Sequence, residues 1–170
     1  MMEVALFGAG RIGKIHAANV VRQAGVKLRY VIDVDAAAAA ALAAQHDASV
    51  ASAETALADP QVGAVVIGSS TDTHADLIMR AAAAGKAIFC EKPVDLAVDR
   101  ARTCAAAVQR AGVTCMIGFQ RRFDPTFAAL KSRLGAGAIG APEMLIVTSR
   151  DPGAPPIPSS RARVGSSRTC

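Results

Sequence analysis

The chain has 170 residues, 52% of them hydrophobic, and a formal net charge of +5. This length and composition suffice for one domain with a hydrophobic core and exclude a wholly disordered chain. Residues 152–170 hold three arginines and no acidic residue, so they carry three of the five net positive charges. The rest of the chain shows no basic stripe, and we therefore expect no nucleic-acid partner.

The cysteines and the N-terminal residues bear on metal binding and on the location in the cell. The four cysteines show no CxxC spacing and no pairing with histidine, so we expect no metal site. Cys90 and Cys115 stand in apolar runs typical of buried thiols, which suit a reducing compartment. The first residues contain neither a basic segment nor a long apolar run. We therefore expect no signal peptide, no membrane span and a cytoplasmic location.

Short apolar runs alternate with helical stretches along residues 4–120. Strands are predicted at 4–7, 27–34, 49–52, 64–70, 87–93 and 113–120. Helices are predicted at 12–24, 36–45, between Ser52 and Pro60, at 74–84 and at 95–111. Ser52 and Thr73 are the expected N-caps of the third and fourth helices, and Gly25, Gly85 and Gly112 are expected to end the first, fourth and fifth helices. This alternation predicts an α/β fold with a doubly wound parallel sheet, the Rossmann fold.

The pattern changes after Arg122. Asp124 is expected to cap a helix that runs to Leu134, and residues 142–150 are expected to form one more strand. From Asp151 the chain is rich in Pro, Ser and Arg without periodicity, which predicts a disordered tail. The pattern therefore divides the chain into a Rossmann domain at 1–122, a segment with one helix and one strand at 123–150, and the tail at 151–170.

Three glycines stand between the first strand and the first helix, at a spacing typical of a dinucleotide-binding turn. In this GxGxxG motif Gly8 permits the tight turn, Gly10 lets a diphosphate approach the backbone, and Gly13 lets helix and strand pack. Unpaired N–H groups at the start of the helix favour a phosphate. The alternative is a glycine turn that binds no ligand.

An acidic residue ends the second strand, 20 positions after Gly13. The carboxylate of Asp33 can accept hydrogen bonds from both ribose hydroxyls and would repel the 2′-phosphate of NADP. The motif therefore predicts NAD as the cofactor. Asp35 stands two positions further on and is an alternative for this role.

Polar residues follow the fourth, fifth and sixth strands, whose carboxyl ends border the ligand crevice in such sheets. Lys92 directly follows an apolar strand, so we expect it to be partly buried and suited to proton transfer to or from a substrate hydroxyl. The alternative is a surface pair of Lys92 with Glu91. His74 is expected to pack at the sheet edge, and His16 to lie on the exposed side of the first helix.

Five segments resemble the glucose-fructose oxidoreductase and inositol dehydrogenase family of NAD(P)-dependent oxidoreductases, and within it the inositol dehydrogenases. They are GAGRIGKIHAANV, VIDVD, STDTHADLI, CEKPVDL and GFQRRFDPTFAAL, and the resemblance covers residues 3–157. It implies that the active-site lysine of the family is Lys92 and that full-length relatives are homo-oligomers. It also implies an NAD site with Gly8, Gly10, Arg11, Ile12, Gly13 and Asp33, and a position near the cofactor or substrate for Ser70, Thr71, His74, Glu91 and Arg121.

The chain departs from the family where the substrate domain would continue. The family motifs S-G-G-x-F-x-D and H-D, with the histidine that acts beside the lysine, do not occur, and the only histidines are His16, His46 and His74. If the reading frame of the gene is shifted by one base, the genetic code permits Ser-Gly-Gly-Leu-Phe-x-Asp-Met in place of residues 162–170. This peptide contains the first of the two missing family motifs. We therefore expect a C-terminally truncated family member; the alternative is a natural short chain. The resemblance then implies an NAD-binding Rossmann domain at 1–122, the first helix and strand of an incomplete α+β substrate domain at 123–150, and an out-of-frame tail at 151–170.

The expected function is NAD-dependent oxidation of a CH–OH group of a polyol or sugar, with myo-inositol as the first choice, by a family member that is inactive as this fragment. In the full-length relative, Lys92 and a histidine would transfer the proton. The alternative is a catalytically silent NAD-binding or regulatory module, which needs only the glycine turn and Asp33.

Overall fold

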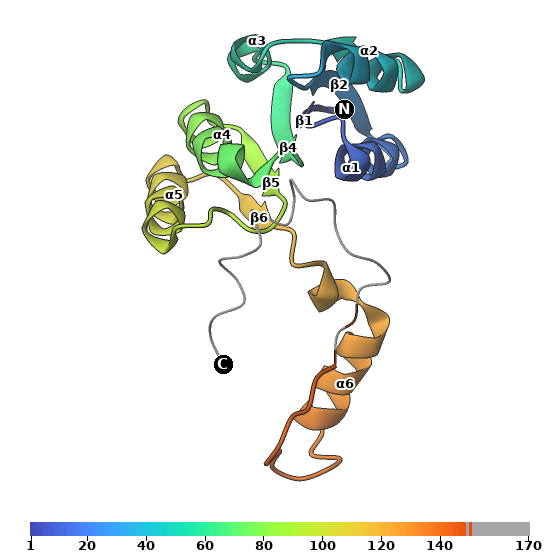
Figure 1. The fold of residues 1–170 in the computed structure, drawn as a ribbon, viewed down its shortest axis with the longest axis vertical. Helices are drawn as coiled ribbons and strands as arrows, with labels where there is room; N and C mark the ends of the chain where they lie inside the picture. Colours follow the sequence, from blue (N-terminus) through green and yellow to red (C-terminus); the bar gives the residue numbers. More distant parts are fainter. Residues whose placement is uncertain (149, 151–170) are drawn as a thin grey trace. The chain divides into compact units, whose positions relative to one another are not determined.

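A computed structural model describes residues 1–148 and 150 of the chain (Figure 1). The chain divides into two compact units, Met1–Gly118 and one that begins at Phe119. Among the described residues, no helix is both long and apolar enough to cross a membrane.

The described part of the first unit contains one sheet of six parallel strands in the order β3-β2-β1-β4-β5-β6. The strands are β1 (Met2–Phe7), β2 (Val26–Ile32), β3 (Ser49–Val50), β4 (Val62–Ile67), β5 (Ala87–Cys90) and β6 (Cys115–Ile117). The chain moves outward from β1 through β2 to β3 and then crosses to β4, on the other side of β1. Figure 1 shows β1 between β2 and β4. The predicted doubly wound Rossmann fold is confirmed, and its switch point lies between β1 and β4.

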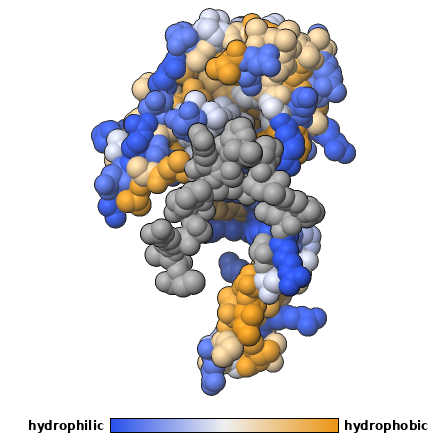
Figure 2. Space-filling view, in the orientation of Figure 1, coloured by the Kyte–Doolittle hydropathy of each residue, from blue (hydrophilic) through white to orange (hydrophobic). Residues whose placement is uncertain are grey.

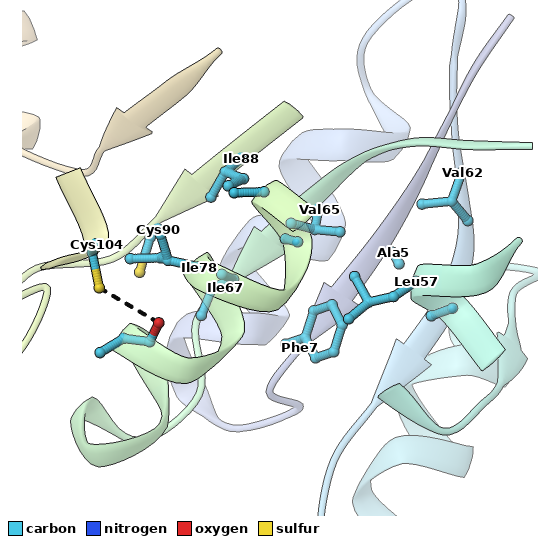
Figure 3. Close-up of a cluster of buried hydrophobic side chains, with 14 residues drawn as sticks. Ala5, Phe7, Leu57, Val62, Val65, Ile67, Ile78, Ile88, Cys90 and Cys104 are labelled. Carbon is cyan, nitrogen blue, oxygen red and sulfur yellow. Dashed lines mark hydrogen bonds between the residues drawn. The ribbon is translucent and has the colours of Figure 1, made fainter. Parts of the chain in front are cut away.

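Helices cover both faces of the sheet, and each face has its own core. The helices of this unit are α1 (Arg11–Val21), α2 (Ala36–Gln45), α3 (Ala53–Ala58), α4 (Thr71–Ala83) and α5 (Val98–Ala111). Val4 and Leu6 of β1 pack in the cluster beneath α1 and α2. Ala5 and Phe7 point the other way, into the cluster beneath α3, α4 and α5 (Figure 3). Because both faces are buried, the central strands consist of continuous apolar runs.

Side-chain N-caps begin two of these helices, and a third helix differs from expectation. Asp35 caps α2 and Ser52 caps α3 through side-chain hydrogen bonds. The prediction that Thr73 caps α4 is wrong, because this helix begins at Thr71 after an extended Ser70. The Thr73 hydroxyl lies inside the first turn and donates to the Ser70 carbonyl at 2.7 Å.

A charged cluster joins β1, β2 and the turn before β4. The guanidinium of Arg29 donates to Glu3 at 2.6 Å and to Asp59 at 2.7 Å. Asp59 also accepts from the backbone N–H of Gln61 at 2.9 Å and from the hydroxyl of Tyr30 at 3.0 Å. The N–H of Gln61, followed by Tyr30 and Arg29, lowers the pKa of Asp59 below its ordinary value.

We expect the Asp59→Asn variant to unfold at a lower urea concentration than the parent at pH 7. Because the pKa of Asp59 is lower in the folded than in the unfolded chain, its stabilisation is present above the ordinary carboxyl pKa. It is lost as the pH falls through the lower folded value, so the two unfolding curves should converge in acid. Glu54→Gln is the control: the pKa of Glu54 is also lowered, but its side chain is 75% exposed and its ion pair with Arg80 lies on the surface, so its loss should be smaller. An equal loss in both variants at pH 7 would contradict the prediction.

The second unit begins with a short 3-10 helix, η1 (Gln120–Phe123), and continues with α6 (Pro125–Gly135). Asp124 accepts from the backbone N–H of Thr126 at 2.8 Å, so the predicted N-cap is confirmed. Proline follows it in the first turn, where its missing N–H costs no helical hydrogen bond.

The strand predicted at 142–150 is wrong for residues 142–148, which form no strand. A strand needs a neighbour for its backbone N–H and C=O groups, and the described residues of this unit contain no other strand. The apolar run is therefore present without the pairing that its pattern favours. The tail predicted at 151–170 lies outside the described residues.

This apolar run is exposed within its unit, and we expect it to drive self-association. Met144, Leu145, Ile146 and Val147 are 80%, 76%, 81% and 68% exposed, and Figure 2 shows hydrophobic residues on the surface of this unit. Exposed apolar patches promote association. Light scattering after gel filtration should show concentration-dependent oligomers, and fewer for a chain cut after residue 122. The matched variant is the uncut 170-residue chain with Ile146→Lys, which should also form fewer oligomers. If oligomers persist in the shortened chain and in this variant, residues 144–147 do not form the contact.

Candidate dinucleotide site

Three glycines shape the turn between β1 and α1. Gly8 has a φ of +103°, and a Cβ there would lie 2.6 Å from the carbonyl oxygen of Gly68, which follows β4. A Cβ on Gly13 would overlap the carbonyl oxygen of Gly8. A Cβ on Gly10 would meet no atom within 4 Å. Two glycines thus allow close packing, and the third leaves open space against the backbone.

A cavity of about 700 Å³ opens at the switch point. Both α1 and α4 begin at its wall, and their N-cap residues, Gly10 and Ser70, make no side-chain capping hydrogen bond. Backbone N–H groups of the first turns therefore favour an anion here. The wall consists of Phe7, Gly8, Gly10, Arg11, Ile12, Ile32, Asp33, Val34, Ala53, Gly68, Ser69, Ser70, Asp72, Thr73, Asp76, Leu77 and Arg80.

Asp33 lies on the cavity wall directly after β2. Its Oδ2 accepts from the backbone N–H of Ala9 at 2.6 Å, and its Oδ1 accepts from the N–H of Asp35 at 2.9 Å. Each oxygen keeps a second lone pair that can accept from a ligand hydroxyl. The carboxylate of Asp35 instead caps α2, and Asp35 does not line the cavity. Of these two carboxylates, that of Asp33 therefore borders the cavity and that of Asp35 does not.

The predicted site residues fall into three groups. Those on the cavity wall are Gly8, Gly10, Arg11, Ile12, Asp33 and Ser70. Those in the first unit but off this wall are Gly13, Thr71, His74, Glu91 and Lys92. Arg121 belongs to η1 of the second unit, where its guanidinium lies 5.4 Å from the centre of the Phe127 ring.

The segment Glu91-Lys92-Pro93 follows β5 directly. The N–H of Glu91 donates to the carbonyl of Ile67 at 2.9 Å, which continues the pairing of β4 and β5 by one residue. The expectation that Lys92 is partly buried is wrong, because its side chain is exposed. The strand ends at Cys90, so the lysine stem extends beyond the packed layers of the sheet. The Lys92–Pro93 peptide is cis.

Two histidines contact this segment. Nε2 of His16 lies 2.9 Å from Oε1 of Glu91, so the expectation of an exposed His16 is wrong, and Glu91 pairs with His16 rather than Lys92. His74 is 2% exposed. Its Nδ1 lies 2.7 Å from the carbonyl oxygen of Pro93 and its Nε2 lies 3.1 Å from that of Ser69.

Sequence analysis missed one wall of the cavity. Thr73, Asp76, Leu77 and Arg80 of α4 line it, together with Ala53 of α3. The spacing of the α4 residues places them on one helix face, and this spacing was present in the sequence. Which face of α4 borders the cavity depends on the packing of its other face into the core.

Cys90, beside Glu91, is not a candidate nucleophile. The side chain is fully buried, and burial raises the pKa of its thiol to about 12. Burial also raises the pKa of the thiols of Cys104 and Cys115. All three remain neutral thiols near pH 7, and neutral thiols are poor nucleophiles.

Several known proteins that match this chain in sequence or fold are named as dehydrogenases. An inositol 2-dehydrogenase of Rhizobium meliloti (strain 1021) is 49% identical over 152 residues, which are 89% of this chain and 46% of the relative. The crystal structure of a putative myo-inositol dehydrogenase from Sinorhizobium meliloti 1021 matches with a TM-score of 0.90 at 46% identity, over 95% of this chain and 49% of that one.

A third comparison concerns a protein solved with its ligands. The scyllo-inositol dehydrogenase of Lactobacillus casei, with bound NAD(H) and scyllo-inositol, matches with a TM-score of 0.77 at 26% identity, over 82% of this chain and 42% of that one. The chain thus spans about half the length of the relatives that it matches. The family model described as an oxidoreductase family with an NAD-binding Rossmann fold matches residues 2–119. With this match and the geometry of the glycine turn, the chain belongs to that oxidoreductase family.

Proposed function

We propose that the first unit binds NAD in the cavity at the switch point and serves a dehydrogenase that oxidises a CH–OH group of a polyol or sugar. The observation that carries the proposal is the combination, in one cavity, of the open space at Gly10 with the carboxylate of Asp33. An inositol is the first substrate to test, because relatives are named inositol dehydrogenases.

The residues of the cavity fit this cofactor. The first turn of α1 and the open backbone at Gly10 would hold the diphosphate, since unpaired N–H groups and the helix dipole both favour negative charge. Asp33 would accept hydrogen bonds from the ribose hydroxyls and disfavour a 2′-phosphate. When bound, NAD supplies the hydride acceptor that the side chains lack.

Lys92 is the proposed catalytic residue. Its exposed ammonium group follows β5, at the same edge of the sheet as the glycine turn. There it would donate a hydrogen bond to the substrate hydroxyl and stabilise the oxygen as its proton leaves. A base that accepts this proton is the second requirement.

A catalytically silent NAD-binding module is the second candidate function. The observation in its favour is that both ring nitrogens of His74 already contact carbonyl oxygens, and Nε2 of His16 contacts Glu91. These contacts leave His74 without a free nitrogen to act as the base. The module would need only the glycine turn and Asp33.

A chimera separates the two candidates. Residues 1–122 of this chain, up to the domain boundary that we propose, replace the matching segment of the Rhizobium meliloti relative. We expect the chimera to reduce NAD with myo-inositol, and its Lys92→Ala variant to lose about 10²-fold or more in turnover with NAD affinity unchanged. A folded chimera that binds NAD without turnover would favour the silent module.

For the 170-residue chain itself we expect NAD binding without detectable myo-inositol oxidation. Both readouts come from one sample, by calorimetry for binding and by absorbance of the reduced cofactor for turnover. Robust turnover would mean that His16, His46 or His74 is the base after all. Absence of NAD binding by a folded chain would contradict the proposed site itself.

We also propose a cytoplasmic location and homo-oligomeric full-length relatives. The first proposal is supported by the described cysteines, Cys90, Cys104 and Cys115, which are free thiols suited to a reducing compartment. The second rests on the family resemblance alone.

A further inference from the structure

Lys92 stands between two residues that are each held by a histidine from a different helix. On one side, the carboxylate of Glu91 contacts His16 of α1 at 2.9 Å. On the other side, the carbonyl of Pro93 contacts His74 of α4 at 2.7 Å. These histidines are 58 positions apart in the sequence, and the proposed function uses neither of them.

The His16 contact is supported on several sides. The side chain of His16 is only 17% exposed, and its ring meets the ring of Phe89 edge-on, with centroids 5.1 Å apart. The ring is also close to Gly68, since a Cβ there would lie 3.6 Å from Cδ2 of His16. Glu91 is held through its backbone as well, by its N–H bond to Ile67. The pair therefore has little freedom to rearrange.

The His74 contact places a proton on a particular ring nitrogen. Carbonyl oxygens only accept hydrogen bonds, so a ring nitrogen that bonds one must carry a proton. The contact of Nδ1 with Pro93 is the shorter of the two, 2.7 Å against 3.1 Å for Nε2 with Ser69. Both nitrogens meet this condition, and the shorter contact assigns the proton to Nδ1, which then donates to the carbonyl of Pro93, immediately after Lys92.

We propose that His16 and His74 are positioning residues that fix the backbone on both sides of Lys92. The inference rests on the proposed function, in which Lys92 is catalytic. An exposed lysine has many rotamers, so its ammonium can be placed over a reacting hydroxyl only if its Cα is held. The N-caps of the two helices, Gly10 and Ser70, both lie on the cavity wall. The two histidine contacts, which we call the His16/His74 clamp, therefore connect Lys92 to the elements that border the proposed cofactor site.

The two histidines use different ring nitrogens, which gives a reciprocal test. The amide nitrogen of asparagine takes the place of Nδ1, and that of glutamine takes the place of Nε2. His16→Gln can still donate to Glu91 and His16→Asn cannot, whereas His74→Asn can still donate to Pro93 and His74→Gln cannot. Each pair loses the imidazole ring in both members, so any difference within a pair reports the hydrogen bond.

The test uses the 170-residue chain without cofactor or substrate. We expect amide hydrogen exchange of Glu91 to accelerate about tenfold in His16→Asn relative to His16→Gln. The amide still bonds Ile67 in both variants, but in His16→Asn the side-chain bond that opposes local opening is lost. The NMR order parameter of the Lys92 amide should fall below about 0.6 in His74→Gln and stay near that of the parent in His74→Asn. The proposal is overturned if the two His16 variants show the same Glu91 exchange rate and the two His74 variants show the same Lys92 order parameter. This holds whether or not these values differ from those of the parent.

A second measurement needs no variant and so applies even if one of the variants fails to fold. In the unaltered chain with ¹⁵N-labelled histidine, the ring of His74 should show a slowly exchanging proton on Nδ1. A ring protonated only on Nε2 would overturn the role of His74. Because neither measurement involves NAD, a failure of the clamp and a failure of the NAD site are seen separately.

Discussion

Replacing Gly13 with alanine is expected to destabilise the first unit by about 3 kcal/mol or more, a large part of the stability of a typical domain. The new Cβ would overlap the carbonyl oxygen of Gly8, which is backbone and cannot rotate away. Gly8 is itself confined, because its turn packs on Gly68 after β4. The strain therefore reaches both central strands, and the melting temperature should fall by about 10 °C.

Gly10→Ala is the matched variant, and its expected effect is the opposite. A Cβ there meets no protein atom within 4 Å, and its backbone, with a φ of −71°, is accessible to alanine. The variant should melt close to the parent, because alanine also restricts the unfolded chain. Its methyl group would occupy the space proposed for the diphosphate, so NAD affinity should fall about 10²-fold or more.

Circular dichroism and NAD calorimetry on both variants check this pair. The prediction is that stability and binding separate, with Gly13→Ala lowering the melting temperature and Gly10→Ala lowering NAD affinity alone. If Gly10→Ala binds NAD as tightly as the parent, the diphosphate does not lie on this turn. A Gly13→Ala chain that melts like the parent would show that the turn can open without cost.

Asp33→Asn is expected to narrow the preference for NAD over NADP about tenfold or more. Asparagine keeps an acceptor oxygen for the N–H of Ala9 but removes the negative charge that would face a 2′-phosphate. Two like charges about 4 Å apart near a protein surface repel by an amount worth at least tenfold in affinity. NADP should therefore bind more tightly to the variant than to the parent, and NAD somewhat less tightly.

Asp35→Ala is the control for this charge change. It removes a neighbouring carboxylate that caps α2, at a cost of about 1 kcal/mol in stability. The ratio of the NAD and NADP dissociation constants should not change. Equal affinities of the unaltered chain for NAD and NADP, or an effect of Asp35→Ala as large as that of Asp33→Asn, would contradict the assignment of Asp33.

Local features of the sequence were enough to predict the sheet and its first turn. The apolar runs of β1 and β4 are too short for helices, and their lack of alternation indicates burial on both faces. The positive φ of Gly8 and the contact of Gly13 with the carbonyl of Gly8 are demands that act within a few residues, whereas no protein atom requires glycine at position 10. The position of Asp33 on the cavity wall was predictable because the end of β2 and the glycine turn meet in folds of this topology.

The tertiary structure alone decided which distant groups meet. His16 and Glu91 are 75 residues apart, and no local pattern relates them. Lys92 is exposed because β5 ends before it, and strand length depends on pairing with β4 and β6. The apolar run at 144–147 has the sequence of a strand but no partner in the described residues. Sequence periodicity determines which residues prefer burial or pairing, and only the packed fold determines what they contact.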